Sequence, residues 1–180
     1  MTSLHRTTLV LGGARSGKSA YAEGLIRAAG GPAIYLATAE AGDGEMAARI
    51  AHHRASRGAG WQTIEEPLDL AGTLRRVAAP DRPVLVDCLT LWLSNLMHAG
   101  CDIAAETATL AACLPEIAGP VVLVSNEVGQ GIVPDNALAR AFRDHAGRLH
   151  QAVATVADQV VFVVAGLPMV LKSPGKPLVK

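Results

Sequence analysis

Short apolar runs rich in β-branched residues alternate along the chain with longer segments whose apolar residues recur at helical spacing. The short runs predict strands at residues 7–11, 33–38, 84–88, 121–125 and 159–164. Several are apolar almost throughout, as expected for strands that helices cover on both faces. Strands that alternate with helices are typical of βαβ units, so we expect a largely parallel sheet. Residues 61–65 predict a short edge strand, and residues 169–172 predict a last, antiparallel one.

The longer segments predict helices at residues 18–28, 44–57, 68–77 and 135–156, with one or two more between residues 89 and 117, broken near Gly100. Asp135 directly follows Pro134 and is a suitable N-cap for the helix after it. The tail 173–180 holds two prolines and a glycine and should be loose. We find no internal repeat, linker or second domain, and therefore expect a single domain over residues 1–180.

Composition narrows the classes of protein. Of 180 residues, 50% are hydrophobic and 18% are charged, which fits one domain with a substantial core and argues against extensive disorder. Aromatic residues make up only 3%, and 16 basic residues balance 16 acidic ones. Neither property suits a surface that binds nucleic acid or an anionic membrane.

Cysteine usage and hydropathy bear on the compartment. Cys88, Cys101 and Cys113 are odd in number and lack a C-x-x-C spacing, so we expect a reduced protein without a zinc site. The apolar run after Arg6 is too short for a signal peptide, and no stretch approaches the length of a membrane span. These features predict a cytoplasmic protein.

The run Gly12-Gly13-Ala14-Arg15-Ser16-Gly17-Lys18-Ser19 lies directly after the first predicted strand and opens the first predicted helix. It fits G-x-x-x-x-G-K-[ST], the phosphate-binding loop of many nucleotide-binding proteins. Glycines let main-chain N–H groups turn toward an anion, and the helix adds its positive N-terminal end. Lys18 would reach the β- and γ-phosphates, and the Ser19 hydroxyl would hold Mg²⁺. A glycine-rich turn that binds nothing would not explain why Lys18 and Ser19 follow the last glycine.

Val84-Leu85-Val86-Asp87 is an apolar strand that ends in an acid, the usual form of a Walker B element. An aspartate there would bind Mg²⁺ directly or through water. The alternative is that Asp87 caps the following helix. Ligand sites in open α/β sheets lie beyond the carboxyl ends of the strands, which suits both motifs. The predicted fold class is α/β: a P-loop NTPase-like (RecA-like) three-layer sandwich, with a mostly parallel sheet and one antiparallel edge strand.

The predicted helix at 44–57 carries two adjacent histidines. Because residues four apart share a helix face, Arg49, His53 and Arg57 form one line with the imidazole between two guanidinium groups. This line suits a phosphate group held beside His53, and flanking positive charge favours the neutral, nucleophilic imidazole. His52 points roughly 100° away. The alternatives are solvated histidines, or positive charges that merely complement the C-terminal end of the helix.

A third polar cluster follows the predicted strand at 121–125 and contains Asn126-Glu127-Val128-Gly129-Gln130-Gly131. A polar loop with glycines after an apolar strand belongs on the same edge as the phosphate loop. Asn126 and Glu127 could hold a substrate hydroxyl or the metal. The alternative is a purely structural turn rich in glycine and proline.

Four blocks together resemble one known family. They are Gly12–Ser19; residues 43–57 with the stretch from Trp61 to Leu70; residues 84–91; and residues 122–136 continuing through Phe142-Arg143-Asp144. In this order they closely resemble the bifunctional adenosylcobinamide kinase / adenosylcobinamide-phosphate guanylyltransferases of cobalamin biosynthesis. The similarity covers nearly the whole chain to about Lys172. The histidine helix combined with Asn-Glu-Val-Gly-x-Gly-Ile-Val-Pro is the specific part of it.

The resemblance implies two successive reactions. A nucleoside triphosphate, ATP or GTP, first phosphorylates the aminopropanol hydroxyl of adenosylcobinamide. GTP then transfers GMP to a histidine with release of pyrophosphate, and the cobinamide phosphate takes up the GMP to give adenosylcobinamide-GDP. In the family this histidine precedes a basic residue, which assigns it to His53. The resemblance also implies a homo-oligomer, a trimer, and nucleotide contacts from the loop and from Thr38, Ala39, Glu40, Arg54, Ala55, Ser56, Arg57, Glu65 and Asp87.

The chemistry expected from the residues agrees with this resemblance. A phosphoramidate intermediate needs a neutral nucleophile, nearby cations and Mg²⁺ for the leaving pyrophosphate. His53, Lys18 and Asp87 are the candidate catalytic residues, with Ser19 and Asp87 as candidate metal ligands. Two alternatives remain open: a monofunctional small-molecule kinase without a covalent intermediate, and a nucleotide-dependent regulatory module. The sequence leaves open which nucleotide serves the kinase step, whether both steps share one site, and where the corrinoid binds.

Overall fold

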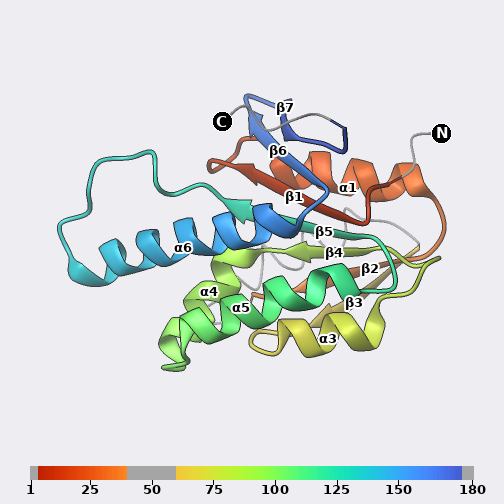
Figure 1. The fold of residues 1–180 in the computed structure, drawn as a ribbon. Helices are drawn as coiled ribbons and strands as arrows, with labels where there is room; N and C mark the ends of the chain where they lie inside the picture. Colours follow the sequence, from red (N-terminus) through yellow and green to blue (C-terminus); the bar gives the residue numbers. More distant parts are fainter. Residues whose placement is uncertain (1–3, 40–59, 176–180) are drawn as a thin grey trace.

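The computed structural model describes residues 4–39 and 60–175, and its centre is one seven-stranded sheet (Figure 1). The strand order is β3-β2-β4-β5-β1-β6-β7. All neighbouring strands pair in parallel except β6 and β7, which are antiparallel. The strands are β1 (Thr7–Gly12), β2 (Ala33–Ala37), β3 (Trp61–Glu65), β4 (Val84–Asp87), β5 (Val121–Asn126), β6 (Gln159–Val164) and β7 (Leu167–Lys172).

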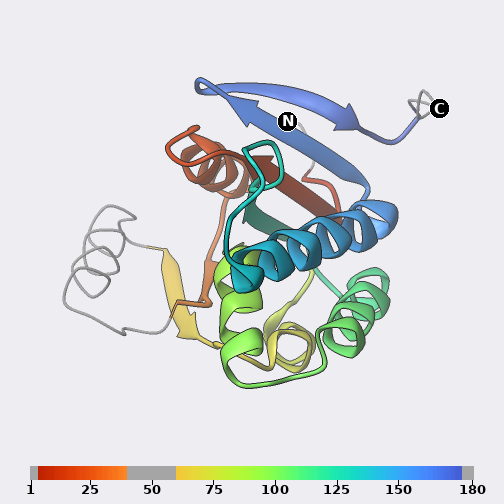
Figure 2. The ribbon, with the colours of Figure 1, turned by 90° about the vertical axis from the view of Figure 1, so that its left-hand side faces the viewer.

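The helices among the described residues are α1 (Lys18–Ala29), α3 (Leu70–Val77), α4 (Leu89–His98), α5 (Ile103–Cys113) with the 3₁₀ turn η1 (Leu114–Glu116), and α6 (Ala137–Val156). Of these, α1 lies on one face of the sheet and α3, α4, α5 and α6 lie on the other (Figures 1 and 2). Alternate residues of a strand point to opposite faces, so Leu9 and Leu11 pack into the cluster formed with α3, α4, α5 and α6. Val10 packs into the second cluster, with Ala22 and Ile26 of α1. These two cores explain why the central strands are apolar on both faces.

The predicted strands are confirmed, with small differences at their ends. Trp61–Glu65 is an edge strand, as expected. The antiparallel strand β7 starts at Leu167 rather than at residue 169, because Ala165 and Gly166 have positive φ angles of 52° and 79° and form a tight two-residue turn. The segment from 89 to 117 divides near Gly100 into α4 and α5, as expected.

The predicted N-cap of the last helix is wrong. α6 begins at Ala137 and its N-cap is Asn136, whose side chain accepts a hydrogen bond from the Ala139 N–H at 2.7 Å. Asp135 lies one residue earlier, outside the cap position. The predicted helix at 44–57 lies outside the described residues, as does most of the tail 173–180. Within the described part of the chain, no helix is both long and apolar enough to span a membrane.

Candidate functional site

Residues from different predicted motifs end up along one edge of the sheet. Gly12, Asn126 and Asp87 are the last residues of β1, β5 and β4, and Thr38 directly follows β2. These strands are parallel, so their carboxyl ends meet at the same edge. Glu65 ends the edge strand β3, which is four strand spacings from β1, or roughly 19 Å. Asp87, Asn126 and Gly12 therefore lie on three neighbouring strands, β4, β5 and β1, while Thr38 after β2 and Glu65 at the end of β3 lie progressively farther from the phosphate loop.

The phosphate loop runs between β1 and α1, as predicted. Gly17 has a φ angle of 94° and is the N-cap of α1, so this position needs the left-handed conformation that glycine adopts readily. Arg15 has a φ angle of 55°. The Ser16 N–H donates to the Gly13 carbonyl at 3.3 Å, and the buried Lys18 donates from Nζ to the same carbonyl at 3.1 Å. The loop thus curves around its own lysine.

Neighbouring elements hold the loop in place. The Gly166 N–H, in the β6–β7 turn, donates to the Ser16 carbonyl at 2.8 Å. The Glu127 N–H donates to the Gly12 carbonyl at 3.0 Å. Ala14 is exposed at the tip of the loop, and Ser19 lies half-buried in the first turn of α1. The loop is therefore fixed between the end of β5 and the last hairpin.

Asp87 is held at the end of β4. Its Oδ2 accepts a hydrogen bond of 2.9 Å from the Tyr35 hydroxyl. The Thr38 hydroxyl accepts from the Cys88 N–H at 2.8 Å and donates to the Cys88 carbonyl at 2.7 Å. The N-cap of α4 is Cys88, so the alternative of Asp87 as a helix cap is wrong. Burial and the neighbouring Asp87 carboxylate raise the pKa of the Cys88 thiol, which keeps it protonated and unreactive. Ala39 follows Thr38, half-buried.

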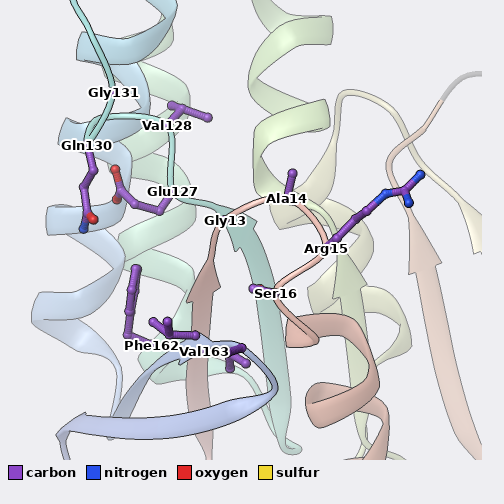
Figure 3. A pocket seen from close by; sticks show the side chains of 12 residues that line it. Gly13, Ala14, Arg15, Ser16, Glu127, Val128, Gln130, Gly131, Phe162 and Val163 are labelled. Carbon is purple, nitrogen blue, oxygen red and sulfur yellow. The ribbon is translucent and has the colours of Figure 1, made fainter.

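A cleft of about 610 Å³ opens beside the phosphate loop (Figure 3). Three segments line it: residues 13–16 of the phosphate loop, the loop after β5, and the end of β6 with the turn to β7. Figure 3 shows Glu127 and Gln130 on one wall and Phe162 and Val163 on another, while Arg15 extends away from them. Its lining combines apolar side chains with a few polar groups, as in small-molecule sites.

Glu127 and Asn126 are both anchored by the protein. Glu127 Oε1 accepts a hydrogen bond of 2.5 Å from the Gly129 N–H, and its Oε2 lies 3.8 Å from His150 Nδ1. Asn126 donates from Nδ2 to the Thr90 hydroxyl at 3.1 Å. Only Glu127 of the two belongs to the cleft lining.

Sequence reasoning missed Tyr35, Thr90 and His150, which anchor the predicted site residues. Tyr35 and Thr90 carry no motif, and their partners lie 52 and 36 residues away. His150 gave a weak signal, because it interrupts the apolar stripe on the buried face of α6. The remaining predicted residues lie outside the described part of the chain: Glu40, Arg49, His53, Arg54, Ala55, Ser56 and Arg57.

Comparison with known proteins identifies the family. A family model described as "Cobinamide kinase / cobinamide phosphate guanyltransferase" matches residues 8–171. The chain belongs to this family. It is 55% identical to the bifunctional adenosylcobalamin biosynthesis protein CobP of Pseudomonas aeruginosa, over 94% of this chain and 98% of that protein. It is 44% identical to CobU of Salmonella typhimurium, over 91% and 98%. The predicted resemblance is confirmed, and membership of this family makes the protein a transferase.

Solved structures agree on the fold. A Pyrococcus horikoshii protein aligns with a TM-score of 0.61 at 10% identity, over 98% of this chain and 90% of that one. The type III secretion ATPase EscN of enteropathogenic E. coli aligns at 0.57 and 10% identity, over 89% of this chain and 43% of that one. The RadB recombinase aligns at 0.50 and 12% identity, over 98% and 85%. At these identities the likeness shows the fold alone, and it confirms the predicted RecA-like P-loop class.

Proposed function

We propose that this protein carries out two successive transfers on a corrinoid. It first phosphorylates the aminopropanol hydroxyl of adenosylcobinamide with ATP or GTP. It then transfers GMP from GTP to that phosphate and produces adenosylcobinamide-GDP. Membership of the family supports this assignment. The observation that carries it is the cleft beside the phosphate loop. Glu127, whose carboxylate can accept a hydrogen bond from a substrate hydroxyl, lines this cleft together with residues 13–16 of the loop.

In the first transfer, the main-chain N–H groups of the loop hold the phosphates, and Lys18 neutralises charge on the β- and γ-phosphates. The substrate hydroxyl oxygen bonds to the γ-phosphorus while the bond to the bridging oxygen breaks, and the nucleoside diphosphate leaves. The hydroxyl proton passes to Glu127. Asn126, fixed by Thr90, is the second residue that we assign to this hydroxyl.

The oxygen donors on this edge suit magnesium. In phosphoryl-transfer sites Mg²⁺ takes one or two carboxylates together with substrate phosphates and water. Ser19 and Asp87 offer a hydroxyl and a carboxylate, and the Tyr35 hydroxyl orients Asp87. When bound, the ion would offset the negative charge of the phosphates. Among residues 4–39 and 60–175, no three His, Cys, Asp or Glu side chains form a metal-binding cluster of their own.

In the second transfer, His53 attacks the α-phosphorus of GTP and pyrophosphate leaves. A phosphate oxygen of the corrinoid then displaces His53 from that phosphorus and takes the GMP. The spacing of Arg49, His53 and Arg57, each four residues from the next in the sequence, supports this step, since guanidinium groups stabilise charge that develops on the phosphate. We assign the guanine nucleotide contacts to Thr38, Ala39, Glu40, Arg54, Ala55, Ser56, Arg57, Glu65 and Asp87.

Protein labelling tests the covalent step. Incubation with α-³²P-GTP and Mg²⁺ should label the protein through an acid-labile, base-stable bond, as expected for a phosphoramidate. His53→Ala should abolish the label, and His52→Ala, its matched control, should keep it. An unlabelled wild-type protein, or undiminished label on His53→Ala, would contradict the assignment. Transfer of γ-phosphate to the corrinoid without protein-bound GMP would instead identify a monofunctional kinase.

We also propose a homo-oligomer, a trimer as the resemblance implies. The supporting feature is β7, an edge strand whose apolar side chains Leu167, Met169, Val170 and Leu171 are exposed. Edge strands offer main-chain groups for pairing, and contiguous exposed apolar surface marks interaction sites. Light scattering should give the mass of three 18.6 kDa chains, and the mass of one chain would contradict the proposal.

A further inference from the structure

A buried polar pair joins β5 to α6, next to the loop that carries Glu127. Ser125 Oγ in β5 and His150 Nε2 in α6 are 2.7 Å apart, and both residues are buried. The neighbours of His150 on the same helix face are Ala146, Leu149 and Val153, all buried in the core. A histidine among these apolar core residues must be hydrogen-bonded, because burying a polar group is unfavourable unless it is paired.

The second ring nitrogen of this histidine faces the cleft residue Glu127. His150 Nδ1 lies 3.8 Å from Glu127 Oε2, about 0.9 Å longer than a usual hydrogen bond and too short for an intervening water. Glu127 is already fixed at two other points: its N–H donates to Gly12 and its Oε1 accepts from Gly129. The main chain of Glu127 is therefore held by β1, while its carboxylate faces the N–H of Gly129 in its own loop and His150 of α6.

The charge of Glu127 selects one form of the ring. Burial lowers the pKa of His150, while the Glu127 carboxylate acts in the opposite direction with a smaller effect, so the imidazole is neutral near pH 7. A neutral imidazole carries one proton. If Nε2 held it, the lone pair of Nδ1 would face a negative carboxylate. With the proton on Nδ1, the Ser125 hydroxyl donates to Nε2 and Nδ1–H points to Glu127.

We propose that Ser125 and His150 form a positioning pair for Glu127, in which Nδ1–H of His150 holds the carboxylate in the cleft so that it can receive the substrate hydroxyl. This rests on the proposed kinase function, because only that function gives Glu127 a hydroxyl to bind. A carboxylate has about four acceptor positions, so the contacts to Gly129 and His150 leave room for the hydroxyl. Loss of the His150 side chain should therefore slow phosphoryl transfer without weakening the binding of the nucleotide.

The first test reads the ring itself and requires no activity. In ¹⁵N-histidine-labelled protein, the His150 resonances are assigned by their loss in His150→Gln. At pH 7 the wild-type ring should be the neutral tautomer with the proton on Nδ1. A proton on Nε2, or a fully protonated ring, would overturn the proposal whatever the enzyme's activity.

The second test is kinetic and compares three variants of α6. His150→Leu removes both polar contacts and should lower the kcat of phosphoryl transfer on the order of 10- to 100-fold, as a misplaced reacting group does. His150→Gln can still accept from Ser125 and donate to Glu127, and should restore most of that kcat. His145→Gln, on a half-buried histidine of the same helix, is the matched control and should behave as wild type.

The two tests separate the positioning role from the function. A fall in kcat for His150→Leu with the KM for the nucleotide within about 2-fold of wild type supports positioning, since the change then acts on transfer rather than on binding. Equal kcat values for His150→Leu and wild type overturn it. If wild-type protein transfers no phosphate at all, the proposed function fails, while the tautomer measurement still gives its own answer on the Ser125–His150–Glu127 geometry.

Discussion

Gly12, the first residue of the phosphate loop, offers a sharp test of how closely this site is packed. An alanine Cβ at position 12 would lie 2.5 Å from Ser16 Oγ and 2.7 Å from the Val163 carbonyl oxygen. The Ser16 side chain can rotate away. Val163 cannot, because it belongs to β6 and pairs with Gly12 in the parallel ladder. The substitution Gly12→Ala must therefore shift one strand against the other.

The size of the effect follows from these contacts. Overpacking a tight site typically costs about 1–3 kcal/mol. Distorting the β1–β6 ladder adds about 1 kcal/mol for one weakened hydrogen bond. We expect Gly12→Ala to lower the free energy of unfolding by about 2–4 kcal/mol. The matched control is Gly13→Ala, because no atom lies within 4 Å of its Cβ position and its φ angle is not positive.

Urea unfolding followed by circular dichroism measures both variants. Gly13→Ala should stay within about 1 kcal/mol of wild type, on the stabilising side, because alanine reduces the freedom of the unfolded chain. Gly12→Ala should unfold at a clearly lower urea concentration with an unchanged slope, which marks a true loss of stability. Equal midpoints for the two variants would refute the packing argument for this end of the loop.

Three further predictions concern residues that the structure adds to the site or corrects. Tyr35→Phe removes the hydroxyl that donates to Asp87, so the Mg²⁺ concentration for half-maximal activity should rise roughly 10-fold; an unchanged Mg²⁺ dependence would contradict it. Asn136→Ala should lower the free energy of unfolding by about 1 kcal/mol, and Asp135→Ala by less than about 0.5 kcal/mol; the reverse order would restore the original cap assignment. Burial lowers the pKa of His150 in the folded state, so the unfolded chain takes up the proton first as the pH falls below about 6.5. Wild type should therefore lose stability relative to His150→Gln, by up to about 1.4 kcal/mol per pH unit. A constant difference in unfolding free energy between the two proteins from pH 7.5 to pH 5.5 would argue against this.

The sheet could be predicted because its strands bury both faces. In a strand such as β4, the buried residues Val84 to Val86 must all be apolar because both faces are covered, and such a run can be recognised in the sequence. The start of β7 could not be predicted in the same way. Its turn is Ala165-Gly166 rather than the usual Asn-Gly, and Pro168 within the strand lacks the N–H of other strand residues, which an edge strand tolerates.

The candidate site likewise contains residues that the sequence could predict and residues that it could not. The phosphate loop and Asp87 have local signatures, since backbone conformation and strand ends impose them on neighbouring residues. The third wall of the cleft comes from Phe162 to Ala165, some 150 residues after the loop, and no motif connects the two. The contact between His150 and Glu127 has no local signature either, because it depends on how α6 packs on the sheet.

The central claim is that one chain adds first a phosphate and then GMP to the same corrinoid. Purified protein is incubated with adenosylcobinamide, Mg²⁺ and either ATP alone or ATP with GTP. The corrinoid products are then separated by chromatography and identified by mass spectrometry. We predict adenosylcobinamide phosphate with ATP alone and adenosylcobinamide-GDP when GTP is added. Unchanged adenosylcobinamide under both conditions would contradict the account.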